Sequence, residues 1–101
     1  MAVTSATSTD GTSLTISIEG RFDFSAHQAF RGAYEKVSPV PKHISVDMSA
    51  TTYLDSSALG MLLLLRDHSG GDASNIKLTG CNEDIRKILT ISNFEQLFEI
   101  V

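Results

Sequence analysis

Polar and apolar residues alternate in three stretches of the chain, at residues 14–18, 44–48 and 76–78. A period of two places the apolar side chains on one face of a β-strand and the polar ones on the other. Strands buried on both faces are usually continuous apolar runs, so this pattern predicts a sheet with helices mainly on one face. The apolar positions are Leu14, Ile16, Ile18, Ile44, Val46, Met48, Ile76 and Leu78.

Two weaker strands complete a predicted sheet of about five strands. The Ser/Thr-rich residues 4–13 contain the pair Asp10-Gly11, shortly before the strand at 14–18. An Asp-Gly pair favours a type I′ hairpin turn, which needs positive φ at both central residues. We therefore expect a short first strand that pairs with the second. Residues 97–101 are predicted to form the last strand.

A period of 3.6 residues predicts two amphipathic helices between these strands. The first begins at Ser25, which has Gln28 three residues later as in a capping box, and it ends before Pro39. The other begins after Asn82 as the N-cap and is closed by Asn93 in the left-handed conformation. The predicted buried positions are Ala29, Phe30, Ala33, Tyr34 and Val37 in the first helix, and Ile85, Ile88 and Leu89 in the other.

A further helix is predicted in the middle of the chain, where Asp55 is suited to be an N-cap. Ser56 and Ser57 then lie in the first turn, where backbone N–H groups lack intrahelical acceptors and the helix dipole is positive. A phosphate on Ser56 would be held there without a basic pocket. Asp and Ser are also ordinary capping residues, and spacing alone favours that simpler interpretation.

The body of the middle helix is apolar on every side, because residues 61–65 form an uninterrupted apolar run. A helix at the rim of a small domain should keep a polar side. The additional apolar side chains have two possible interpretations. They pack against both the sheet and a neighbouring helix, or they form a partner surface that includes Met61, Leu64 or Leu65. The predicted order is strand, strand, helix, strand, helix, strand, helix, strand. This order gives an α/β fold with a single mixed sheet, in one domain over residues 1–101.

Composition and charge narrow the class of protein. The chain has 101 residues, of which 42% are hydrophobic and 20% charged, as in ordinary globular proteins. Its net charge is −4 and its eight Lys and Arg residues are scattered, which argues against a nucleic-acid partner. Cys81 is the single cysteine, and the first residues contain no basic segment followed by an apolar run. We therefore expect a cytoplasmic protein with no membrane partner.

The residue pattern does not support three alternative catalytic or metal sites. Ser56 and His68 with an aspartate would make a hydrolase triad, but no G-x-S-x-G motif is present. The three histidines are separated by 16 and 25 positions, which is not a metal-ligand spacing. Asp23, Asp47 and Asp55 suggest an Mg²⁺ site, yet the paired early aspartates and late lysine of a phosphoaspartate receiver are missing. We expect no catalytic residue, no metal and no cofactor.

Two segments resemble the signature of STAS domains, specifically of the anti-sigma factor antagonists of bacteria. They are HISVDM at 43–48 and YLDSSALG at 53–60. Residues 18–23 resemble the family's turn from the second strand into the first helix, and residues 93–100 its closing segment. The resemblance covers nearly the whole chain. The chain departs from the commonest pattern at Ala58, where many members have glycine.

The resemblance implies a partner-switching protein rather than an enzyme. The unphosphorylated chain is expected to bind an anti-sigma factor, often itself a serine kinase, and thereby to free a sigma factor. Phosphorylation would end the binding, and a PP2C-type phosphatase would restore it. The alternative within the family is a scaffold or accessory subunit of a signalling or transport complex that is not phosphorylated. We expect a monomer or a weak dimer.

The resemblance also assigns site residues. In the family the phosphate acceptor is the serine directly after the aspartate, which is Ser56 here, and Ser57 is the second candidate. The expected partner-binding residues are Asp23, Asp55, Ser57, Ala58, Met61 and Leu64.

Overall fold

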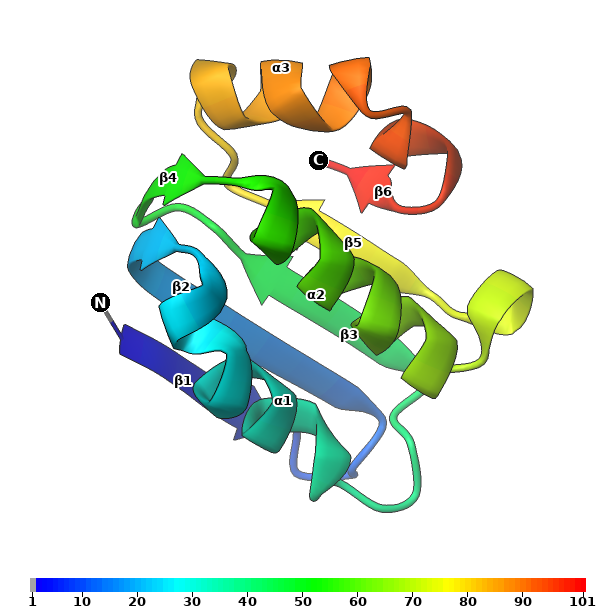
Figure 1. Ribbon diagram of the computed structural model, residues 1–101. Helices are drawn as coiled ribbons and strands as arrows, with labels where there is room; N and C mark the ends of the chain where they lie inside the picture. The colour runs from blue at the N-terminus through cyan, green and yellow to red at the C-terminus, as the bar shows by residue number, and fades with distance from the viewer. Residues whose placement is uncertain (1) are drawn as a thin grey trace.

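Six strands form one mixed sheet in the computed structural model, which describes residues 2–101. Five of them follow the order β1-β2-β3-β5-β6, and β4 pairs with β2 off this path (Figure 1). β1 is antiparallel to β2, and every other pair is parallel. The strands are β1 (Ala2–Thr7), β2 (Ser13–Phe22), β3 (His43–Asp47), β4 (Thr51–Leu54), β5 (Ile76–Thr79) and β6 (Glu99–Ile100).

The predicted hairpin between β1 and β2 is confirmed, but its predicted turn type is wrong. Gly11 has a φ of 75°, whereas Asp10 does not have positive φ, so the turn is not type I′. The connection is a longer loop that is closed by a hydrogen bond from the Ser8 N–H to the Ser13 carbonyl (2.9 Å). The Asp10 carboxylate accepts hydrogen bonds from Ser8 and Thr12, and these bonds favour the longer loop.

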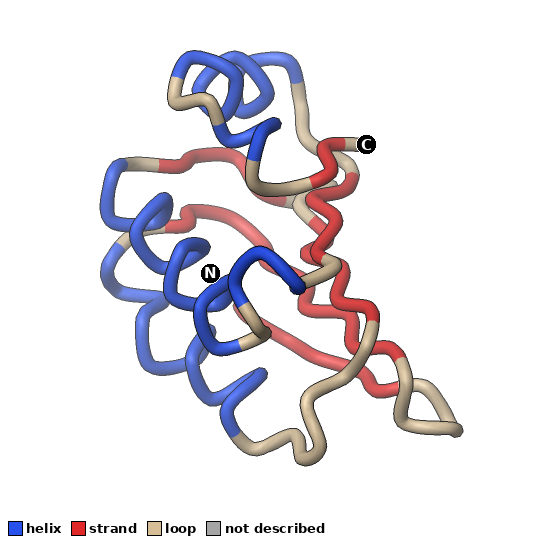
Figure 2. Tube along the Cα trace, turned by 90° about the vertical axis from the view of Figure 1, so that its right-hand side faces the viewer, coloured by secondary structure: helices blue, strands red, loops and turns tan. Residues whose placement is uncertain are grey.

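The helices lie on one side of the sheet, as the alternating strands predicted. Figure 2 shows the helical segments on one side of the sheet and no helix of residues 2–101 over its other face. The buried residues of β2, β3 and β5 are those at the predicted alternating positions, with Phe22 at the end of β2 in addition. None of the helices in this part of the chain is long and apolar enough to cross a bilayer. The helices are α1 (His27–Glu35), α2 (Ser56–His68) and α3 (Glu83–Ile91).

The start of α1 differs from the prediction. The side-chain cap is Asp23 rather than Ser25, and it caps the turn before α1: its carboxylate accepts from the Ser25 N–H at 3.0 Å. A short 3₁₀ turn, Phe24–Ala26, then leads into α1. Phe30 and Tyr34 are buried as predicted, but Ala29 is exposed and Ala26, which the pattern missed, is buried. Ala26, Phe30 and Tyr34 repeat at a spacing of four and form the core face, so Ala29 lies off that face.

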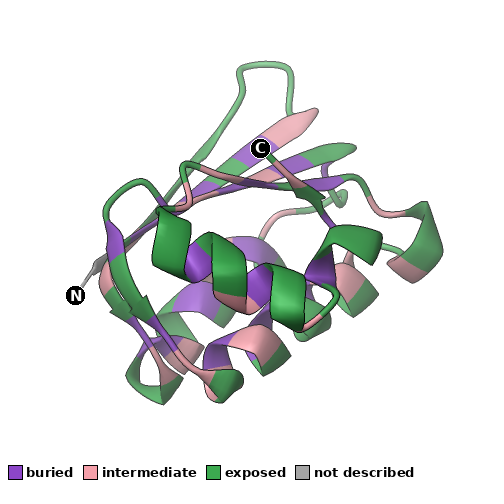
Figure 3. Ribbon diagram, turned by 90° about the horizontal axis from the view of Figure 1, so that it is seen from above, coloured by how far each residue is buried: buried purple, intermediate pink, exposed green. Residues whose placement is uncertain are grey.

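Helix α2 has a distinct core face despite its continuous apolar run. Its buried residues follow the spacing of one helix face, and all lie at or below 4% exposure. Leu63 and Leu64 lie on the other side and are 39% and 52% exposed. Figure 3 shows buried and exposed residues alternating along the helices. The buried residues are Ala58, Met61, Leu62 and Leu65.

Strand β4 was not predicted, which is why the sheet has six strands rather than about five. Its four residues are buried only at Thr51 and Leu54, so the pattern has no period of two. Pairing with β2 forms the strand, and the buried Thr51 hydroxyl donates to the Ile18 carbonyl at 2.8 Å. By contrast, the predicted Asn82 cap of α3 and the left-handed Asn93 (φ 61°) are both confirmed.

Candidate functional site

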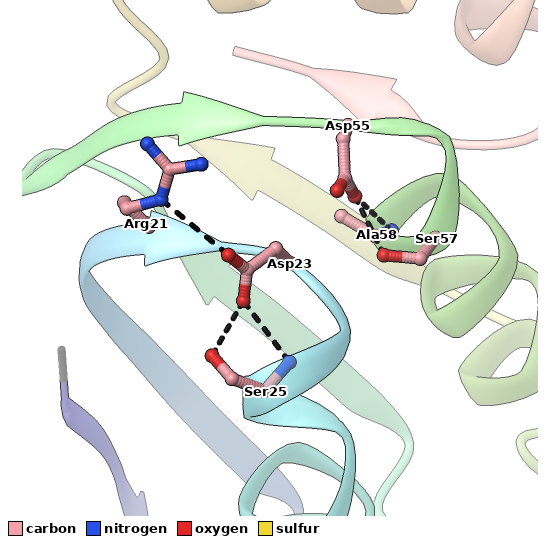
Figure 4. A network of polar contacts seen from close by, with 6 residues as sticks. All are labelled: Arg21, Asp23, Ser25, Asp55, Ser57 and Ala58. Carbon is pink, nitrogen blue, oxygen red and sulfur yellow. Dashed lines mark hydrogen bonds and ion pairs between the residues drawn. The ribbon is translucent and has the colours of Figure 1, made fainter.

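Asp23 and Asp55 are brought together by the parallel pairing of β2 and β4. Arg21 is in register with Tyr53, and the next residues of both strands are also paired. Both aspartates therefore follow directly after the carboxyl ends of neighbouring strands, as Figure 4 shows. In α/β sheets this end is the usual place for binding sites.

Asp55 is the N-cap of α2, as predicted. Its carboxylate accepts the Ala58 N–H at 3.1 Å and the Ser57 hydroxyl at 2.6 Å (Figure 4). The Ser57 hydroxyl is the main cause that lowers the pKa of Asp55, and the backbone N–H groups of Ala58 and Ser57 add to it. Burial and the charge of Asp23 act in the opposite direction. The carboxylate is therefore ionised at neutral pH.

The two serines of the first turn have different surroundings. The hydroxyl of Ser57 is partly buried and is committed to Asp55. Ser56 is exposed, and within residues 2–101 its hydroxyl has no hydrogen-bond partner. A hydroxyl that attacks a phosphoryl donor must be accessible and must not be held in another hydrogen bond. Ser56 meets both conditions, whereas the hydroxyl of Ser57 is held by Asp55.

Asp23 lies in a second small network beside Asp55. Its carboxylate accepts from the hydroxyl and the N–H of Ser25, and these bonds lower its pKa, with a smaller contribution from Arg21. The Arg21 guanidinium lies 3.4 Å from Asp23 and stacks over the ring of Tyr53, 4.0 Å from its centroid. One arginine thus links the ends of β2 and β4 beside two carboxylates.

Sequence reasoning missed the aromatic part of this site. Phe24 is 70% exposed and stacks on His27, with 5.3 Å between the ring centroids. Tyr53 is 39% exposed. The sequence does contain an aromatic residue directly after Asp23 and another two residues before Asp55, but they form one site only because β4 pairs with β2. We define the acceptor surface as Arg21, Asp23, Phe24, Tyr53, Asp55 and Ser56.

Two of the predicted partner-binding residues are core residues, so that part of the prediction is wrong. Ala58 has no exposed surface and Met61 is 4% exposed. Leu65, considered with them, is also fully buried. They lie on the face of α2 that packs on the sheet, where a partner has no access. Leu64 remains exposed, and a hollow beside it is lined by Tyr34 and His68 of the α1–α2 side.

The acceptor surface contains acidic groups but no metal-ligand set. Across residues 2–101, no group of three His, Cys, Asp or Glu side chains is placed to hold a metal ion. The polar atoms of Asp23 and Asp55 are directed to serine hydroxyls and backbone N–H groups instead. The site therefore consists of the exposed Ser56 hydroxyl beside two carboxylates that are fixed by hydrogen bonds.

Residues 5–101 match the family model described as "Mlab, STAS domain". The chain belongs to the STAS family. Proteins of this family are binding proteins rather than enzymes. A STAS-domain containing protein of Pseudomonas aeruginosa strain UCBPP-PA14 is 62% identical over 100 residues, which are 99% of each chain.

Solved structures share the STAS fold at low identity. A putative anti-sigma factor antagonist from Thermotoga maritima has a TM-score of 0.81 and 14% identity, over 97% of this chain and 84% of the other. The phosphorylated form of the Bacillus cell fate determinant SpoIIAA has a TM-score of 0.75 and 18% identity, over 99% and 91% of the two chains. These likenesses establish the mixed six-stranded sheet with three helices as the family fold.

Proposed function

We propose that this STAS protein is an anti-sigma factor antagonist whose binding is switched by phosphorylation of Ser56. The observation that carries the proposal is the contrast within the first turn of α2. Ser56 has an exposed, unbonded hydroxyl, whereas the hydroxyl of Ser57 donates to the cap Asp55 at 2.6 Å. A kinase that approaches this turn meets one available hydroxyl.

A phosphate on Ser56 would change the charge of the acceptor surface more than its shape. It adds about −1.5 to −2 at neutral pH. The free N–H groups of the first turn and the positive end of the α2 dipole favour such a group. Asp23 and Asp55 oppose it, because both carboxylates are ionised and lie at the same edge of the sheet. The fold thus accepts the phosphate while the surface becomes strongly negative.

The partner is proposed to contact the acceptor surface and to extend along the outer side of α2. Ser56, Gly60 and Leu64 are exposed and repeat at a spacing of four, so they line one side of the helix. The exposed aromatic rings of Phe24 and Tyr53 offer the kind of contact that dominates binding energy at interfaces. A phosphate beside these rings would be desolvated or repelled when the partner binds.

The proposed cycle takes place in the cytoplasm and involves an anti-sigma factor, a serine kinase and a phosphatase. The anti-sigma factor, which in the simplest case is also the serine kinase, binds the unphosphorylated form. A PP2C-type phosphatase removes the phosphate. SpoIIAA, which shares this fold, has a phosphorylated form, and this supports a phosphorylated state for the present chain. If no phosphorylated state exists, the accessory-subunit alternative replaces the switch.

The proposal is tested by phosphorylation of three purified proteins: wild type, Ser56→Ala and Ser57→Ala. Each is incubated with the cognate kinase and ATP, and the modified residue is mapped by mass spectrometry. We expect wild type and Ser57→Ala to carry phosphate on Ser56, and Ser56→Ala to carry none. Phosphate on Ser57 of the wild type, or full labelling of Ser56→Ala, would overturn the assignment.

A further inference from the structure

Strand β1 forms an open edge of the sheet. In the described part of the chain it pairs with β2 and with no other strand (Figure 1). Its six residues, AVTSAT, include no charge and no proline. Natural edge strands are usually protected against pairing by lysines, prolines, bulges or a short length. The opposite edge has such protection, since β6 is only two residues long. β1 has none of these features.

The register of the hairpin identifies the unpaired backbone groups of β1. The Ser8 N–H donates to the Ser13 carbonyl, so these two residues are a hydrogen-bonded pair. Such pairs alternate along an antiparallel ladder. The even-numbered residues of β1 therefore face β2, and the N–H and C=O groups of Val3, Ser5 and Thr7 point away from the sheet.

We propose that β1 is a self-association edge, which pairs antiparallel with β1 of a second copy of this chain about a twofold axis at Ser5. This register places Val3 opposite Thr7 of the second copy and Ser5 opposite its own equivalent. All three are then hydrogen-bonded pairs, which gives about six backbone hydrogen bonds across the axis. The two sheets become one continuous sheet. The inference does not depend on the proposed function at Ser56.

The charge and shape of the edge favour a second copy as the occupant. The protein has a net charge of −4, yet no charged side chain of β1 would meet its equivalent across the axis. Helix α1 packs on β1, and its Arg31 and Glu35 face the hollow beside α2. By helical geometry the exposed Ala29 lies on the opposite flank, towards the open edge. A second copy would place its α1 beside this flank, where alanine allows close approach.

The interface is small, so the dimer is weak. A six-residue edge and one helix flank bury less surface than the roughly 1,200 Å² that stable complexes need. We expect association at high protein concentration only.

The test is sedimentation equilibrium over a concentration series, from about 10 μM to about 1 mM, a range that covers weak association. The wild-type mass should rise above the monomer value of 10.9 kDa. Ser5→Pro removes an outward N–H without touching the bonds to β2, so it should weaken association at least about tenfold. Ser5→Ala keeps that N–H and should associate like the wild type. Circular dichroism checks that each variant is folded.

A second variant and a residue-level measurement keep the outcome clear if Ser5→Pro unfolds. Thr4→Lys with Ala6→Lys leaves the backbone intact but places lysines opposite each other across the axis, and it should also prevent the rise in mass. In hydrogen exchange, the amides of Val3, Ser5 and Thr7 should become protected as concentration increases. A wild type that stays at the monomer mass at every concentration would overturn the proposal. So would a dimer that forms without protection of these amides.

Discussion

The first turns of α2 and α3 are capped in the same way. Asp55 accepts the N–H of Ala58 at 3.1 Å, and Asn82 accepts the N–H of Ile85 at 2.9 Å. Both caps have extended backbone and follow a parallel strand of the same sheet. One bond from a cap to the third residue after it satisfies one of the unpaired N–H groups in each helix.

The two turns differ in the residues that follow the cap. In α3 these are Glu83 and Asp84, whose permanent charges favour the positive end of the helix dipole. In α2 they are Ser56 and Ser57, and the first turn has no acidic residue. Helix α3 therefore carries its stabilising charge in the sequence, whereas α2 leaves the same position neutral, where the proposed phosphorylation of Ser56 would add a charge.

The largest expected effect comes from placing a permanent charge in α2 as well. Ser56→Asp should weaken binding to the anti-sigma factor by about 10- to 100-fold, because like charges across an interface cost several kcal/mol. The matched control is Glu83→Ser, which removes the equivalent charge from α3 and should leave the affinity unchanged. Isothermal titration calorimetry measures both. Equal effects of the two changes would contradict the distinction between the helices.

A second prediction compares the exposed apolar residues of the two helices. Leu64 of α2 and Ile91 of α3 are 52% and 81% exposed. Leu64→Gln should weaken partner binding by about tenfold, the loss typical of one important interface side chain. Ile91→Gln should have no effect on binding. Both variants should keep the wild-type melting temperature, and a binding loss confined to Ile91→Gln would move the docking surface to α3.

Local signals in the sequence predicted the caps of α2 and α3 and most strands, because a cap or an alternating strand depends on residues close in sequence. Asp55, Asn82 and Asn93 are examples. β4 depends on its pairing with β2, which no local pattern contains. The core face of α2 could not be identified, because in an apolar run such as residues 61–65 only packing decides which side is buried. The resemblance to the family implied that Asp23 and Asp55 both lie beside Ser56. Their arrangement could not be predicted without β4, whose pairing with β2 brings them to the same edge of the sheet.

A third prediction concerns the stability that each cap provides. Asn82→Ala should lower the free energy of unfolding by about 1 kcal/mol or slightly more. Its amide also donates to the Thr51 carbonyl of β4 at 3.3 Å, so this cap ties α3 to the sheet. Ser57→Ala should cost less, because Asp55 still accepts the Ala58 N–H without it. Urea unfolding of the two variants measures the difference. A larger loss for Ser57→Ala would contradict this order.

The smallest expected effect is a difference in acid sensitivity between the two caps. The pKa of Asp55 is lowered in the folded protein, chiefly by the Ser57 hydroxyl. Its contribution to stability is therefore complete above the ordinary aspartate pKa of about 3.9 and is lost as the pH falls through the lowered value. Asn82 does not titrate. Wild type and Asp55→Asn should thus differ in urea midpoint by a constant amount near neutral pH, and the difference should change only below about pH 4. A change centred near pH 6 would assign the titration to another group.

The most direct test of the account is the intact mass of the protein isolated from its own cells, with the phosphorylated residue mapped. We expect a second species heavier by one phosphate, with the phosphate on Ser56, and we expect only the unmodified species to co-purify with the anti-sigma factor. Phosphate on Ser57, equal co-purification of both species, or a single unmodified species under every growth condition would contradict the assignment of Ser56 as the switch.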